Sequence, residues 1–152
     1  MKKSETPRFK IRVSPLTYAL LGLMVVEIVL AIMSLNLPWG KTSTGTDIRL
    51  GLPGLLPWFG FIPVLLQLGY IVVEARVLQG LYLVANFLIG AFLIFVQTLT
   101  YLRYSSYEFG FYLVFALGAV VMVAGIVCLV ENRFYERLKQ KGHAREIPVT
   151  FG

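Results

Sequence analysis

Four long apolar segments occupy most of this 152-residue chain, and they constrain its fold more than any other feature. They cover residues 16–37, 57–73, 77–102 and 109–130. A helix needs roughly 20 apolar residues to cross a hydrocarbon core of about 30 Å. The chain is 57% hydrophobic and only 14% charged, whereas a soluble domain is about half apolar and about a quarter charged. The sequence therefore predicts one integral membrane domain without a separate soluble part.

We predict an all-α bundle of four helices, antiparallel to their neighbours, at residues 16–37, 57–75, 77–102 and 109–141, the last extending into the cytoplasm. Each helix carries small or polar residues at steps of three and four, an average near 3.5 that is typical of left-handed packing. In membranes such residues let helices approach and bond. The predicted inward stripes are Glu27, Ala31 and Ser34; Gly60, Pro63, Gln67, Tyr70 and Glu74; Asn86, Gly90, Leu93, Gln97 and Thr100; and Phe111, Val114, Gly118, Val121, Gly125 and Cys128.

The distribution of basic residues predicts the orientation. Of 14 Lys and Arg residues, five precede the first helix, one lies in the turn between the second and third helices, and five follow the fourth apolar segment. With four spans these eleven fall on one side and three on the other, and the basic side is normally cytoplasmic. We therefore expect both termini in the cytoplasm of a plasma-membrane protein. The short basic tails are suited to anionic lipid headgroups, and the net charge of +6 does not indicate nucleic-acid binding.

The first extracytoplasmic loop, residues 38–56, is the only long connection between the predicted helices. Its centre, residues 41–50, places Thr-rich flanks around Gly45, which favours a short β-hairpin. Trp39 and Trp58 lie at its two ends. Because connecting loops often carry recognition functions, we expect this loop and these two side chains to form an interface with a partner.

Glu27 is the first candidate for a functional residue, because it lies halfway along the first predicted helix. A charge at the centre of a bilayer costs a few kcal/mol at least, so such residues usually face inward and often mark function. We expect burial to favour the neutral acid. Gln67 should lie at a similar depth on the antiparallel second helix and could bond to Glu27. The alternative is that this bond only ties the two helices together.

Three further polar sites are predicted. Asn86 and Gln97, in the third helix, either line a polar cavity with Glu27 and Gln67 or make interhelical hydrogen bonds. Glu74 should lie near Arg12 at the cytoplasmic boundary, where an exposed ion pair is common and weak.

Cysteine and histidine counts exclude several kinds of chemistry. Cys128 is the single cysteine and His143 the single histidine, so the chain cannot form an internal disulfide, and these two residues alone cannot bind a metal. We expect no cofactor. The sequence has no recognisable nucleophile–base pair or phosphate-binding loop, so we also expect no enzymatic activity.

Two families share limited features with this chain. A glutamate inside the first of four helices, here Glu27, resembles the small multidrug-resistance transporters, although this chain is longer and has a long first outer loop. Pro38-Trp39-Gly40 entering a β-prone loop is similar to claudin-like tetraspan proteins, whose paired loop cysteines are absent here. Neither resemblance transfers functional residues.

Two functional hypotheses follow from the sequence. The first is a non-catalytic accessory or scaffolding subunit that acts through its helix faces and outer loop, with a membrane-protein partner or as a homo-oligomer. The alternative is a small oligomeric proton-coupled transporter or channel in which Glu27 is the titrating group. A lipid- or quinone-modifying enzyme is disfavoured, because Glu27 and Glu74 should lie at different depths and cannot share a reacting atom.

Overall fold

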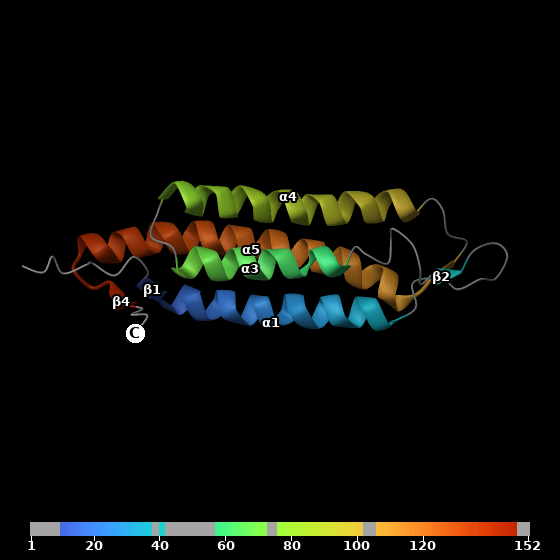
Figure 1. Cartoon of the computed structure of the whole chain (residues 1–152), viewed down its shortest axis with the longest axis horizontal. Helices are drawn as coiled ribbons and strands as arrows, with labels where there is room; N and C mark the ends of the chain where they lie inside the picture. The colour runs from blue at the N-terminus through green and yellow to red at the C-terminus, as the bar shows by residue number, and fades with distance from the viewer. Residues whose placement is uncertain (1–9, 38–39, 42–56, 73–75, 102–105, 149–152) are drawn as a thin grey trace, which may run out of the picture.

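The computed structural model describes residues 10–37, 40–41, 57–72, 76–101 and 106–148 (Figure 1). It is mostly helical, with α1 (Pro15–Asn36), α3 (Phe61–Val72), α4 (Arg76–Tyr101) and α5 (Phe109–Gln140). Helix α5 packs against α1 and α4, and α3 contacts α1, α4 and α5. Within the described residues, α1, α5 and the segment 79–99 of α4 are long and apolar enough to cross a membrane. The prediction of a helical membrane bundle is therefore supported.

Short local sequences set the helix ends. Ser14 and Thr17 form a reciprocal capping box at the start of α1, and Pro15 occupies the first helical position, where its missing amide hydrogen costs nothing. Helix α5 ends at Gln140, and Gly142, just beyond its C-cap Lys141, has φ +71. His143 N–H donates to the carbonyl of Leu138, as in a Schellman motif. The fourth helix was predicted to end at residue 141, and it ends one residue earlier.

The second predicted helix, residues 57–75, is interrupted near its start, and its last three residues lie outside the described residues. Residues 57–59 form one helical turn, Gly60 interrupts it, and α3 then runs from Phe61 to Val72. Pro63 explains the interruption, because a proline ring clashes with the carbonyl four residues earlier, here that of Phe59. The part of this apolar helical segment that the structure describes, Pro57–Val72, is about 24 Å long at about 1.5 Å per residue.

Two small antiparallel sheets lie at opposite ends of the bundle (Figure 1). At one end β1 (Lys10–Val13) pairs with β4 (Arg145–Pro148), and this is called the β1–β4 end. At the other end β2 (Gly40–Lys41) pairs with β3 (Ser106–Tyr107). The sequence did not predict either pairing. The predicted hairpin of residues 41–50 falls, beyond Lys41, outside the described residues.

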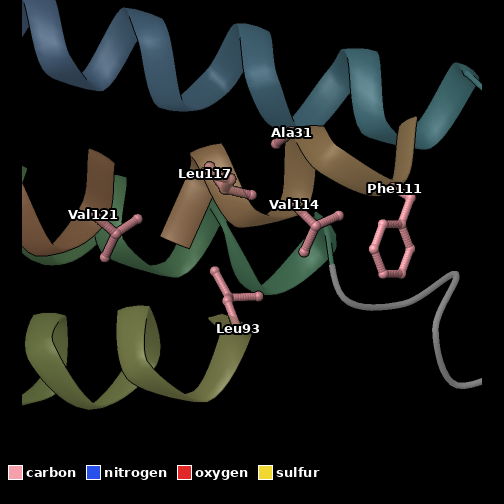
Figure 2. Packing of buried hydrophobic residues seen from close by; sticks show 6 residues of the cluster. All are labelled: Ala31, Leu93, Phe111, Val114, Leu117 and Val121. Carbon is pink, nitrogen blue, oxygen red and sulfur yellow. The ribbon is translucent and has the colours of Figure 1, made fainter. Parts of the chain in front are cut away.

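The predicted stripes form the interior of the bundle wherever the structure describes them. Towards the β2–β3 end, six fully buried residues from α1, α4 and α5 form one cluster (Figure 2): Ala31, Leu93, Phe111, Val114, Leu117 and Val121. Towards the β1–β4 end a second cluster consists of Leu20, Met24, Val64, Tyr70, Ile71 and Cys128. Side chains such as Leu65, Leu88 and Phe95 point outward and are more than half exposed, as expected of a surface that faces lipid.

Candidate functional site

Glu27 and Gln67 meet in the interior of the bundle. Glu27 lies near the middle of α1 and Gln67 in α3, and both side chains are fully buried. Gln67 Nε2 donates a hydrogen bond to Glu27 Oε1 over 2.7 Å. The depth argument from the sequence therefore placed the two residues correctly. The contact itself does not decide between a structural and a functional role.

The remaining oxygen of each group has an unusual environment. Among the residues that the structure describes, Glu27 Oε2 and Gln67 Oε1 have no hydrogen-bond partner. Buried polar atoms are nearly always bonded. Gln67 Oε1 is always an acceptor, and Glu27 Oε2 is an acceptor unless it carries a proton. The site therefore has more hydrogen-bond acceptors than donors, and a proton or another donor would stabilise it.

Tyr70 and Cys128 extend this region. The Tyr70 hydroxyl donates to the backbone carbonyl of Cys128 over 2.7 Å, which ties α3 to α5. Cys128 is buried, and it lies close enough to Glu27 and Glu131 for both carboxyl groups to act on it electrostatically. Three helices thus contribute polar groups to one interior region.

Glu131 is a second buried carboxyl group that the sequence analysis missed. Its side chain is 1% exposed, although it lies in the polar sequence after the fourth apolar segment. One helical turn further along α5, Tyr135 is also buried, and its hydroxyl donates to Glu146 Oε1 of β4. The three-four spacing of Cys128, Glu131 and Tyr135 continues the stripe of α5 and could have identified Glu131.

Among the described residues, neither Gln97 nor Asn86 is hydrogen-bonded to Glu27, so the predicted four-residue polar site is not formed. Gln97 Nε2 donates to the carbonyl of Phe111 over 2.9 Å, near the start of α5. On α5, Phe111 is about 25 Å from Cys128 at about 1.5 Å per residue, so Gln97 is remote from Glu27. Asn86 is buried, and its Oδ1 has no hydrogen-bond partner in the described part of the chain.

The structure describes only some residues of the other predicted sites. Trp58 is 58% exposed, and its ring lies 5.8 Å from that of Phe61. Trp39, Glu74 and the side chain of Arg12 lie outside the described residues, so the structure does not place the predicted ion pair. In the described ranges, no three His, Cys, Asp or Glu side chains are arranged to hold a metal.

An open apolar groove runs along the outside of the bundle between the start of the second helical segment and α4. Its volume is about 770 Å³, and Phe59, Ile62, Leu88, Ile89, Phe92 and Phe95 line it. Such a groove, without polar groups, fits hydrocarbon or another apolar helix face.

Comparison with known proteins gives no relationship from which a function could be transferred. No family model matches the chain, and no curated protein or solved structure resembles it significantly.

Proposed function

We propose that this protein is a non-catalytic, four-span membrane protein that acts as an accessory or scaffolding subunit through its helix faces and extracytoplasmic loop. This proposal rests on one observation: the interior polar groups form hydrogen bonds between helices. Tyr70 bonds to the Cys128 carbonyl, Gln97 to the Phe111 carbonyl, and Gln67 to Glu27. These bonds select one arrangement of helices, which suits a subunit that presents fixed outer surfaces.

The pairing of β1 with β4 supports the four-span topology, because it brings the two ends of the described chain to the same end of the bundle. The segment Pro57–Val72 would cross as the shortest span, and local thinning of the bilayer can accommodate it. The charge asymmetry puts the β1–β4 end in the cytoplasm of a plasma-membrane protein. Four basic residues of α5 and its end are exposed there for anionic headgroups, namely Arg133, Arg137, Lys139 and Lys141.

The test is gentle extraction followed by native mass spectrometry. The proposal expects a distinct membrane protein at fixed stoichiometry with the chain. Replacing Leu88 and Phe92 with alanine in the groove should weaken this complex if the α3–α4 face is used, and Val25→Ala with Val29→Ala on the exposed face of α1 is the matched control. Glu27→Gln should leave the complex and its cellular activity nearly intact. Loss of activity in Glu27→Gln, with fold and partners preserved, would contradict the proposal.

The second candidate function is a small oligomeric proton-coupled transporter or channel with Glu27 as the titrating group. The observation that favours it is the unpartnered Oε2 of a fully buried carboxyl group among the described residues, since ionisable groups inside membranes commonly serve proton or ion pathways. Four helices enclose little space, so this function would require an oligomer. In liposomes it predicts a flux that depends on pH, and a flux that is absent or independent of pH would contradict it.

A further inference from the structure

Several protonatable groups at the interface of α1, α3 and α5 follow one another from the interior towards the β1–β4 end. The series begins at Glu27, which is fully buried, and passes Cys128 to Glu131, which is 1% exposed. It continues with Tyr135 and ends at Glu146, which is partly exposed. From Cys128 to Tyr135 the rise along α5 is about 10 Å.

We propose that Glu27 is a proton-binding site, and that its proton exchanges with water at the β1–β4 end through Glu131, Tyr135 and Glu146. The inference deepens the second candidate function, on which it rests for the role of Glu27, and adds the route that the proton takes. It requires no transported substrate and no partner protein.

The number of hydrogen-bond donors at Glu27 and Gln67 indicates what binds there. Gln67 donates to Glu27 Oε1, so a proton on Oε2 provides the donor that the two remaining acceptors, Glu27 Oε2 and Gln67 Oε1, lack within the described residues. Two oxygen atoms are too few for a metal cation such as Mg²⁺ or Ca²⁺, each of which takes six or more oxygen ligands. A proton therefore satisfies this pair better than a metal ion.

The groups around the site also bear on proton binding. Tyr70 comes from α3, Cys128 and Glu131 from α5, and Tyr82 of α4 packs against the same hydrophobic cluster. The other titratable side chain of α1, Tyr18, is 66% exposed and lies away from the interior. At the β1–β4 end Arg145 and Glu146 belong to β4, and Lys10 and Arg12 of β1 pair in register with Pro148 and Glu146. Towards Glu27 the described groups are thus acids or neutral, which favours a bound proton.

Labelling with dicyclohexylcarbodiimide in the full-length protein tests the site. This apolar reagent adds to a protonated carboxyl group and rearranges to an N-acylurea without a leaving group, so the adduct is read by mass spectrometry. We expect labelling at Glu27 that increases as the pH falls and is lost in Glu27→Gln. Absence of label at Glu27, or labelling independent of pH, would overturn the proposal. Protection by sodium ions at constant pH would identify a metal cation as the occupant and would also overturn it.

Infrared hydrogen–deuterium exchange tests the route. The carbonyl band of protonated Glu27, assigned by its loss in Glu27→Gln, should shift in D₂O severalfold more slowly in Glu131→Gln and in Tyr135→Phe. Glu136→Gln, on the exposed side of α5, is the matched control and should leave the rate unchanged. Unchanged rates in both route variants would overturn the route. If liposomes show no flux, the transporter function is rejected. The labelling and exchange measurements would still test proton binding at Glu27 and its route.

Discussion

Two glycines show how single residues determine the helix contacts. In the contact of α4 with α5, a Cβ at Gly90 would lie 3.1 Å from the Gly118 carbonyl, and a Cβ at Gly118 would lie 3.1 Å from the Gly90 carbonyl. The two backbones therefore meet directly. Without a hydrophobic force between helices in lipid, such close packing is a main source of association.

Gly118→Ala is expected to destabilise the bundle by about 1–3 kcal/mol, the usual cost of overpacking. The added methyl group would lie 2.7 Å from Ile94 Cγ1 and close to the Gly90 carbonyl, so α4 and α5 must separate. Thermal unfolding in detergent measures the effect. Gly22→Ala is the control, because outside the adjoining backbone of α1 its added Cβ would meet no atom within 4 Å. Equal stability of the two variants would contradict the close contact.

The hydrogen bond between Gln67 and Glu27 predicts energetic coupling between α1 and α3. Glu27→Leu and Gln67→Leu together should destabilise the protein less than the sum of the single changes, by about 1 kcal/mol. The reason is that each single change leaves a buried polar partner, whereas the double change leaves none. A double-mutant cycle of unfolding free energies measures this coupling. Additive effects would show that the bond contributes no pairwise stability.

At the scale of the elements, the strand β4 changes the interpretation of the tails. It pairs with β1, and its Glu146 accepts a hydrogen bond from Tyr135 of α5. From the sequence, the residues of β1 were expected only to belong to a short basic tail suited to anionic lipid headgroups. In the structure they form half of a sheet that closes one end of the bundle.

Ending the chain at Gly142 removes β4 and should make amide hydrogen exchange of residues 10–13 much faster, because β1 loses its strand partner. Exchange within the middle of α1 should stay slow. Hydrogen–deuterium exchange with mass spectrometry provides the measurement, and removal of residues 149–152 alone serves as the control. Unchanged protection of residues 10–13 would mean that other contacts hold β1.

At the scale of the whole molecule, the sheets place both described ends of the chain at the β1–β4 end and the start of α5 at the other (Figure 1). Combined with the excess of basic residues near the termini, this arrangement predicts that the β1–β4 end faces the cytoplasm.

In a Cys128→Ala background, a cysteine at position 108 should react with a membrane-impermeant maleimide on intact cells. A cysteine at position 143 should react only after permeabilisation. Glu108 precedes α5, and His143 follows it and is exposed, so the two positions report opposite ends of one helix. The reverse pattern would invert the proposed orientation, and labelling of both positions on intact cells would exclude a spanning α5.

The sequence alone determined the membrane class, the helices and their inward faces. Long apolar segments have no stable alternative to helices in lipid, and small and polar side chains must face protein. Hence Glu27, Ala31 and Ser34 were correctly assigned to a buried face, and the depth of Gln67 followed from antiparallel geometry.

Only the tertiary structure decided which distant segments meet. The pairings of β1 with β4 and of β2 with β3 join residues far apart in the chain, and two- to four-residue strands carry almost no local signal. Glu131 was missed for the same reason: its sequence neighbourhood is polar, and its burial depends on the packing of α5 against the other helices. Local hydropathy fixes which face of a helix turns inward, whereas the burial of a charged group depends on contacts between segments that no short stretch of sequence contains.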